Sequence, residues 1–213
     1  MRIDVISDTI CPWCFIGKRR LEEALSARPG LDVEIVWRPY ELNPDMPAQG
    51  MDRREYMAMK FGGAEGAAKA YEPVRVAGQS VGISFAFEKM EKVPSTIKSH
   101  CLIHWAGEGD QQDRMVEALF RAYFLEGRDI GDDDTLVAIA REVGLDGDEI
   151  GRKLAAGDDL NLIRTRAQVA RSSGVTGVPC FIVDKKYAVV GAQDAAVFVD
   201  LFDKLASQET KAE

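Results

Sequence analysis

The sequence lacks the features of a nucleic-acid-binding, exported or membrane-spanning protein. It carries 27 lysines and arginines against 35 aspartates and glutamates, so its formal net charge is −8 at pH 7. That charge disfavours nucleic acid and anionic membranes as partners. No apolar run approaches the roughly 20 residues of a membrane-spanning helix, and Asp4 and Asp8 interrupt any signal-peptide core at the start of the chain. We therefore expect a cytoplasmic protein without a nucleic-acid or membrane partner.

Histidine and cysteine are also scarce, with two and four residues respectively, which argues against a metal protein. A structural zinc ion needs four ligands, usually in two close pairs. Cys11 and Cys14 form such a pair, but the other two cysteines are isolated. His100 and His104 lie one helical turn apart without a carboxylate on the same face, so we expect no metal there. Cytoplasmic thiols stay mostly reduced, so we expect no structural disulfide.

The most informative motif is Cys11-Pro12-Trp13-Cys14, which lies between a strand-like run and a helix-like segment. If Cys11 is the N-cap, Pro12 takes the first helical position, where a missing N–H costs nothing. The unpaired N–H groups of Trp13 and Cys14 and the helix dipole then favour negative charge on the Cys11 sulfur. Cys14 lies deeper and is the natural resolving thiol. The motif predicts a thiol–disulfide exchange site; a zinc knuckle or two inert cysteines are the alternatives.

The order of predicted elements divides the chain into two parts. A strand at 2–7, a helix at 15–25 and a strand at 33–38 form a right-handed βαβ unit. Helical periodicity then dominates, at residues 53–61, 64–81, 95–107, 111–126, 133–143 and 146–155. The last elements are a helix at 160–173, a hairpin of strands at 180–183 and 187–190, and a helix at 195–205. We expect an α/β domain of residues 1–46 and 157–213 with residues 47–156 inserted as a helical domain.

The spacing of apolar residues also predicts which helix faces are buried. On the first helix we expect Lys18 to lie on the surface. On the last helix we expect Val197, Leu201 and Leu205 to form the buried face.

Five stretches of the chain resemble one protein family. They are residues 8–21 (DTICPWCFIGKRRL), 38–47 (RPYELNPDMP), 118–124 (ALFRAYF), 174–179 (GVTGVP) and 191–193 (GAQ). Together with the element order they resemble the FrnE-like cytosolic branch of the DsbA family. The resemblance implies a thioredoxin fold, βαβ plus ββα, with a large all-helical insertion between the halves. The same superfamily contains 2-hydroxychromene-2-carboxylate isomerases and kappa-class glutathione transferases.

The resemblance implies a second site element at Val178-Pro179. In thioredoxin-like folds the matching proline is cis and faces the dithiol, and the backbone of the preceding residue pairs with an extended substrate. Pro179 would then shape the catalytic surface and keep a metal from bridging the sulfurs. Val178, Pro12 and Trp13 would contact the substrate. The alternative is an ordinary proline at a strand edge.

The chain departs from the family pattern at Cys180, where relatives usually carry threonine. If the fold is right, a third sulfur lies near the dithiol. Free cysteine is among the most buried residue types, so an inert strand residue is the first interpretation; a trap for Cys11 or a determinant of substrate choice is the other. The role of Asp8 also has two interpretations. It either forms a turn or helix cap, or it shifts a pKa or moves a proton.

We predict a thiol–disulfide oxidoreductase that works through Cys11 and Cys14. We expect no tightly bound cofactor, with glutathione or another thiol as a co-substrate. Its partners would be a disulfide- or thiol-bearing protein, peptide or small molecule and a cellular thiol reductant. The chief alternative is a glutathione-dependent isomerase or transferase, whose members usually carry serine where Cys11 stands, and a third is a non-catalytic holdase. The reductase, isomerase or oxidase direction depends on how strongly the folded site stabilises thiolate over disulfide.

Overall fold

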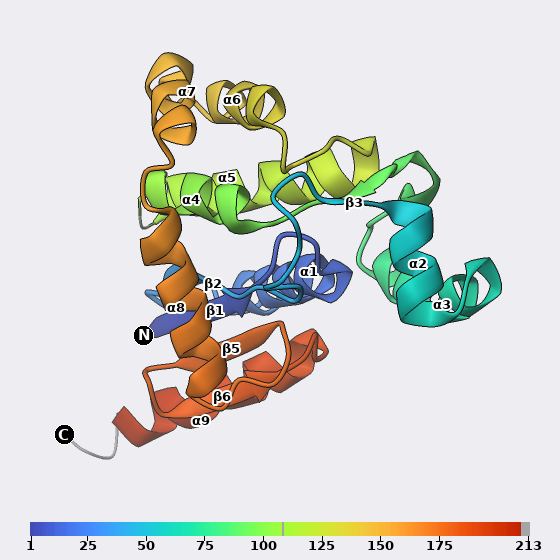
Figure 1. Ribbon diagram of the computed structural model, residues 1–213. Helices are drawn as coiled ribbons and strands as arrows, with labels where there is room; N and C mark the ends of the chain where they lie inside the picture. The colour runs from blue at the N-terminus through green and yellow to red at the C-terminus, as the bar shows by residue number, and fades with distance from the viewer. Residues whose placement is uncertain (108, 210–213) are drawn as a thin grey trace.

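A four-stranded mixed sheet organises the computed structural model, which describes residues 1–107 and 109–209 (Figure 1). Its strands are β1 (Arg2–Ser7), β2 (Glu34–Pro39), β5 (Cys180–Val183) and β6 (Tyr187–Val190), in the order β2-β1-β5-β6. β1 pairs in parallel with β2 and antiparallel with β5, and β5 pairs antiparallel with β6. Because Ile6 pairs with Cys180, the end of β1 lies beside the start of β5. This register brings the segments after β1 and before β5 together.

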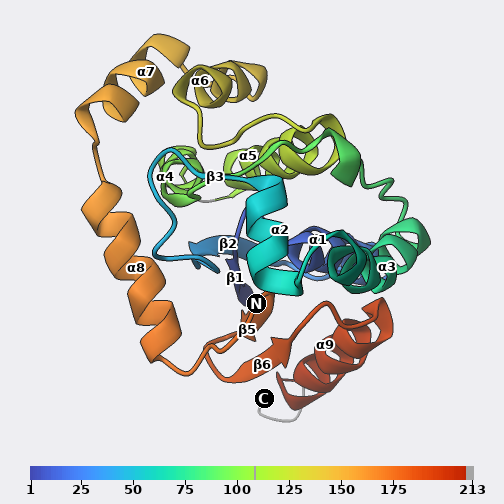
Figure 2. The ribbon, with the colours of Figure 1, turned by 45° about the vertical axis from the view of Figure 1, so that its right-hand side comes forward.

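Helices cover both faces of this sheet (Figure 2). Side chains alternate between the faces along each strand. Val5 and Phe181 belong to the main core together with residues of α1 (Pro12–Ser26) and α9 (Ala195–Glu209). Ile6 and Cys180 belong to a smaller cluster that includes Ala170 of α8 (Leu160–Ser172). The sheet is therefore the middle layer between α1 with α9 and α8.

Between β2 and α8 the chain forms a block of helices, which lies beside the sheet in Figure 1. These are α2 (Arg53–Phe61), α3 (Ala64–Ser80), α4 (Ile97–Trp105), α5 (Asp110–Arg121), α6 (Asp133–Glu142) and α7 (Gly147–Ala156). The side chains of Asp52, Asp132 and Asp146 accept hydrogen bonds from the first amides of α2, α6 and α7, which explains where these helices begin. This order is the predicted thioredoxin fold with a helical insertion.

Three short elements in the insertion, two strands and a 3₁₀ turn, are absent from the sequence prediction, and a fourth, a π-helical turn, lies at the end of the helix predicted at 111–126. β3 (Met51–Asp52) and β4 (Lys92–Val93) form a two-residue antiparallel ladder, η1 (Phe87–Lys89) is a 3₁₀ turn, and η2 (Ala122–Glu126) is a π-helical turn that continues α5. A strand of two residues is too short to show the alternation on which a sequence prediction depends. In the described residues, no helix combines the length and the apolar character needed to cross a membrane.

An aromatic cluster joins the insertion to the helix that carries the dithiol. The Phe15 ring of α1 stacks on Phe120 with 5.1 Å between ring centroids, and on Phe124 with 6.3 Å. Phe85 meets the Phe15 ring edge-on at 6.2 Å. All four rings belong to the main core. Burial of this much aromatic surface fixes α1 between the sheet and the insertion.

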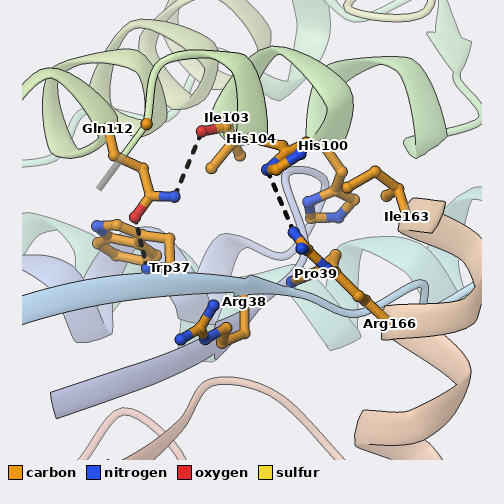
Figure 3. A pocket seen from close by; sticks show the side chains of 10 residues that line it. Trp37, Arg38, Pro39, His100, Ile103, His104, Gln112, Ile163 and Arg166 are labelled. Carbon is orange, nitrogen blue, oxygen red and sulfur yellow. Dashed lines mark hydrogen bonds between the residues drawn. The ribbon is translucent and has the colours of Figure 1, made fainter. Parts of the chain in front are cut away.

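A buried glutamine connects the outer strand of the sheet to the helices (Figure 3). The Gln112 side-chain oxygen accepts a hydrogen bond from the Trp37 backbone N–H at 2.8 Å. Its amide nitrogen donates to the Ile103 carbonyl at 3.3 Å. The glutamine thus satisfies a backbone donor of β2 that has no neighbouring strand on that side.

The expectation that Lys18 lies on the surface is wrong. The side chain is 3% exposed and enters a group of charges between α1 and α5. Its Nζ lies 2.9 Å from Asp113 and 3.6 Å from Glu117, and it also pairs with Glu22. These acidic partners come from α5 as well as from α1, so the first helix alone did not reveal them.

The buried face of α9 also differs from the prediction. Phe198, Phe202 and Leu205 are buried, whereas Val197 is 43% exposed and Leu201 is half-buried. Phe198 packs edge-on against Phe181 of β5 with 4.9 Å between centroids. The helix is rotated to bury its two phenylalanines, which have more apolar area to remove from water than the aliphatic residues.

Candidate active site

The dithiol lies where the first strand gives way to the first helix. Cys11 is the N-cap of α1 with an extended backbone, and Pro12 stands in the first turn, as the sequence predicts. The Cys11 N–H donates to the Asp8 carbonyl, and the Cys14 N–H donates to the Cys11 carbonyl, both at 3.0 Å. These bonds form a tight turn that holds Cys11 at the N-cap and Cys14 in the first turn of α1.

Cys11 is less accessible than the sequence suggested, whereas Cys14 lies deeper, as the sequence predicted. Cys11 is 4% exposed and Cys14 is 1% exposed, and both are free thiols. Burial, followed by the hydrogen bond and the charge of Cys11, raises the pKa of the Cys14 thiol well above its usual value. Trp13, between them, is 36% exposed. The side chain open to solvent in this motif is therefore the indole.

Ser7 is a site residue that the sequence reasoning missed. Its hydroxyl and the Asp8 backbone both oppose the rise in the pKa of Cys14, although burial prevails. Ser7 is the last residue of β1 and is itself buried. The sequence could have indicated this contact, because Ser7 is a small polar residue at the end of a strand just before the C-x-x-C motif.

The loop before β5 faces the dithiol. The Val178–Pro179 peptide bond is cis. The Cys11 Sγ lies 3.5 Å from the Val178 carbonyl oxygen, in the geometry of a thiol that donates a hydrogen bond. The Pro179 carbonyl accepts from the Gly191 N–H at 2.8 Å. In the described part of the chain the Val178 N–H has no hydrogen-bond partner.

Gly17 allows α1 to approach this loop closely. A Cβ atom at this position would lie 2.9 Å from the Pro179 Cγ and 3.0 Å from the Phe181 Cζ. Distances this short are hardly ever found for real Cβ atoms in folded proteins. The glycine therefore sets the spacing between the helix that carries the dithiol and the strand that follows Pro179.

We expect Gly17→Ala to destabilise the protein by about 1–3 kcal/mol, because the added methyl group forces α1 away from β5. Urea unfolding measures the change. The matched control is Gly30→Ala, whose Cβ has nothing within 4 Å and should leave the midpoint unchanged or higher. An unchanged midpoint in Gly17→Ala would show that the interface has room for the methyl group.

Two buried titratable side chains, Asp8 and His100, lie next to the dithiol turn. Asp8 is fully buried, and its Oδ2 accepts from the Leu42 N–H at 2.6 Å. The other carboxylate oxygen lies 3.4 Å from the His100 Nε2, which is also 3.1 Å from the Tyr40 carbonyl. Asp8 thus joins the loop after β2 to α4 through its side chain, while its backbone holds Cys11. These contacts show a structural role for Asp8, and its charge also adds to the rise in the pKa of Glu41; a role in moving a proton stays a prediction.

Glu41 adds a second carboxyl group next to this pair. Burial raises the pKa of Glu41; the positive charge of His100 opposes this rise, and the negative charge of Asp8 adds to it. The side chain is nearly buried. The site therefore holds two carboxyl groups and one imidazole under the loop after β2, a cluster that spans three distant stretches of sequence.

Cys180 and Cys101 belong to other core clusters than the dithiol. Cys180 packs in the smaller cluster with Ile6 and Tyr40, whereas Cys11 and Cys14 belong to the main core. Burial raises the pKa of the Cys180 thiol. Alternation along β5 turns its side chain to the α8 face of the sheet. The structure thus shows a buried strand residue, and the role of this sulfur stays a prediction.

His100 and His104 line one cavity of the molecule but have different partners. His100 contacts Asp8 and Tyr40, and His104 receives a hydrogen bond from Arg166 at 3.2 Å. Among the described residues no group of three or more histidine, cysteine, aspartate and glutamate side chains is arranged to hold a metal ion.

A comparison with protein families matches the DSBA-like thioredoxin domain over residues 2–203. The chain belongs to this family. The crystal structure of the probable DsbA oxidoreductase SCO1869 from Streptomyces coelicolor is 32% identical and has a TM-score of 0.83, with 96% of this chain and 89% of that chain covered. The predicted family and the thioredoxin fold with a helical insertion are therefore confirmed.

Two further solved structures share the DsbA-like fold at lower identity. One is 2-hydroxychromene-2-carboxylate isomerase, 15% identical with a TM-score of 0.76 and 100% of both chains covered. The other is the cytosolic disulfide reductase DsbM from Pseudomonas aeruginosa with GSH, 20% identical with a TM-score of 0.63, covering 100% of this chain and 99% of that chain. The fold thus accommodates both of the chemistries that the sequence left as alternatives, and the site residues must decide between them.

Proposed function

We propose that the protein exchanges thiols and disulfides through Cys11 and Cys14. The observation that carries the proposal is the position of Cys11 at the N-cap of α1, with its sulfur 3.5 Å from the Val178 carbonyl. The positive end of a helix dipole favours negative charge on a group at such a position; the Cys14 N–H, which the sequence predicted to be unpaired, donates to the Cys11 carbonyl instead. Cys14, one turn along and buried, has a raised pKa and serves as the resolving thiol.

The exchange proceeds in two displacements. The Cys11 thiolate attacks one sulfur of a substrate disulfide, the substrate S–S bond breaks, and the departing thiolate takes up a proton from solvent. Cys14 then loses its proton and attacks the Cys11 sulfur, which releases the second substrate thiolate. Two electrons pass from the dithiol to the substrate, and the Cys11–Cys14 disulfide forms. The same steps in reverse oxidise a substrate dithiol.

The loop before β5 offers a surface for an extended substrate. The Val178 N–H has no partner within the described chain and lies next to the sulfur-facing Val178 carbonyl. A substrate strand could pair with these groups as it would with a sheet edge. Pro179 shapes this surface and excludes a bridging metal, while Pro12 and the exposed Trp13 contact the substrate from the other side.

The partners follow from this chemistry. The substrate is a protein, peptide or small molecule with a disulfide or thiol group, and a cellular thiol reductant returns the dithiol to its starting state. Glutathione suits either the co-substrate or the reductant role, and no tightly bound cofactor is needed. The compartment that we propose is the cytoplasm; the similar structure of DsbM, a cytosolic disulfide reductase, supports this proposal.

We expect Cys14→Ser to accumulate mixed disulfides, because Cys11 can still attack but nothing resolves the product. Incubation with an oxidised peptide should give an adduct of protein and peptide by mass spectrometry, and dithiothreitol should reverse it. The double variant Cys11→Ser/Cys14→Ser is the control and should form no adduct. Normal turnover in Cys14→Ser would contradict the proposed resolving role.

The wild-type protein gives a second test. In glutathione redox buffers it should pass between the dithiol and a disulfide that links Cys11 and Cys14, followed by mass and by thiol labelling. A failure to form that intramolecular disulfide at any ratio would reject the proposal. Glutathione conjugation or isomerisation that persists in Cys14→Ser would favour the isomerase or transferase alternative, and client protection that neither cysteine substitution changes would favour a holdase.

A further inference from the structure

The resolving step of the exchange meets a physical obstacle at Cys14. Its sulfur must be negatively charged when it attacks Cys11, yet the residue is 1% exposed, so water hardly solvates the anion. Burial, together with the hydrogen bond and the charge of Cys11, favours the neutral thiol and raises the pKa of Cys14. A buried anion of this kind needs hydrogen-bond donors from the protein itself.

The end of β1 supplies two such donors. The Ser7 hydroxyl and the Asp8 backbone N–H both donate hydrogen bonds to the Cys14 sulfur, and both favour its charged form. Ser7 is 5% exposed and Asp8 is fully buried, so neither donor is shared with bulk water. Three buried groups thus meet where β1 ends and α1 begins: one sulfur and two donors directed at it.

The backbone fixes both donors in place. The Ser7 carbonyl accepts the Tyr40 N–H at 2.9 Å, which ties the end of β1 to the chain after β2. The Asp8 carbonyl accepts the Cys11 N–H at 3.0 Å, which begins the tight turn into α1. The Asp8 N–H donates to no backbone carbonyl within the described ranges of the chain, and is left for the sulfur. Donors held in this way need no rearrangement when charge develops on the sulfur.

We propose that Ser7 is a catalytic residue of the resolving step: its hydroxyl donates a hydrogen bond to the Cys14 sulfur while that sulfur is negatively charged. The inference rests on the proposed exchange function and concerns its second displacement. There the Cys14 thiol gives its proton to solvent, the bond between Cys14 and Cys11 forms, and the bond from Cys11 to the substrate sulfur breaks. The electron pair of that bond leaves with the substrate thiolate, and Ser7 keeps its own proton throughout.

A disulfide with two coloured halves separates the two displacements. Rapid mixing of the reduced protein with excess dithiobis-nitrobenzoate should release one coloured thiolate when Cys11 attacks and a second when Cys14 resolves. The first rate rises with the reagent concentration; the second is independent of it, because the attack is intramolecular. Ser7→Ala should slow the second release by about tenfold or more, the loss expected for one hydrogen bond to a charged group, and change the first by less than about twofold.

Two sets of variants separate the hydroxyl from the packing. Ser7→Thr and Ser7→Val have side chains of the same shape, and the threonine variant, which keeps the hydroxyl, should resolve about tenfold faster than the valine variant. This pair decides the question if the alanine variant does not fold. Ser99→Ala is the matched control: its hydroxyl is also fully buried, but it lies 2.8 Å from the Thr9 hydroxyl and donates to the Thr96 carbonyl. It should leave both releases unchanged.

The outcomes distinguish the role of Ser7 from the exchange function. Two releases in the wild type, with an equal second rate in Ser7→Ala or equal second rates in the threonine and valine variants, would overturn the role of Ser7 and leave the exchange function standing. A second release that slows as much in Ser99→Ala would also overturn it. A wild-type protein that forms no Cys11–Cys14 disulfide would reject the exchange function, and this inference with it.

Discussion

Replacement of Cys11 by serine should lower the rate of disulfide exchange by at least about a thousandfold, the scale on which removal of a nucleophile acts. The serine hydroxyl has nearly the same size and can keep the N-cap position, but it does not ionise at neutral pH as a thiol can. The fold should therefore survive while the attack is lost. Reduction of a peptide disulfide, followed by the release of its fluorescent half, measures the rate.

Cys180→Ala is the matched control for this result. Cys180 is also a buried cysteine, but it packs in the small cluster with Ile6 and Tyr40. Its loss should change the exchange rate by less than about twofold and cost some stability for the lost sulfur contacts. If exchange survives in Cys11→Ser, or is lost in Cys180→Ala, then Cys11 is not the nucleophile that we propose.

Lys18→Met should destabilise the protein by about 1–3 kcal/mol, because it removes the charged hydrogen bonds that a buried ammonium makes to partly exposed carboxylates. The Lys18 Nζ lies between Asp113 and Glu117 of α5 and Glu22 of α1. The methionine keeps the apolar length of the side chain, so the loss reports the charge. Urea unfolding at neutral pH measures it.

The pH dependence of this loss follows from Glu22. Although burial alone would raise its pKa, the hydrogen bonds and charges of Lys18 and Arg19 lower it. A lowered carboxyl pKa stabilises the fold above the unfolded-state value and loses that contribution as the pH falls through the folded-state value. The difference between Lys18→Met and the wild type should therefore shrink in acid.

The exposed pair of Lys92 and Asp129 supplies the control for Lys18. Their side chains approach to 3.2 Å, but Lys92 is half exposed. Lys92→Met should cost less than about 1 kcal/mol, as is usual for a surface ion pair. If the two variants lose equal stability, the charges around Lys18 are not the cause.

Local patterns predicted the fold and the position of the dithiol well. Helical periodicity and the spacing of apolar residues lie within the elements they define, and the five family stretches added the order of the halves. The C-x-x-C motif also predicted where α1 begins, because Cys11 is its N-cap and Pro12 is its first residue. Such features need no knowledge of the tertiary structure.

Contacts between distant segments could not be predicted in the same way. Lys18 seemed exposed because its acidic neighbours Asp113 and Glu117 come from another helix. The pair of Asp8 and His100 depends on how the insertion folds back over the loop after β2. The low exposure of Cys11 likewise results from packing by the Val178 loop. Each of these features exists only after the halves have come together.

The hydrogen bonds of Gln112 have a consequence for how the protein behaves in concentrated solution. An open outer strand is a template on which other chains can add, and this is a common start of aggregation. The Trp37 N–H of β2 already donates to Gln112, so it cannot pair with an added strand at this edge of the sheet. The opposite outer strand, β6, carries the exposed Tyr187 and Val190. Self-association through strand addition would therefore begin at β6, where a single lysine in place of Val190 should suppress it.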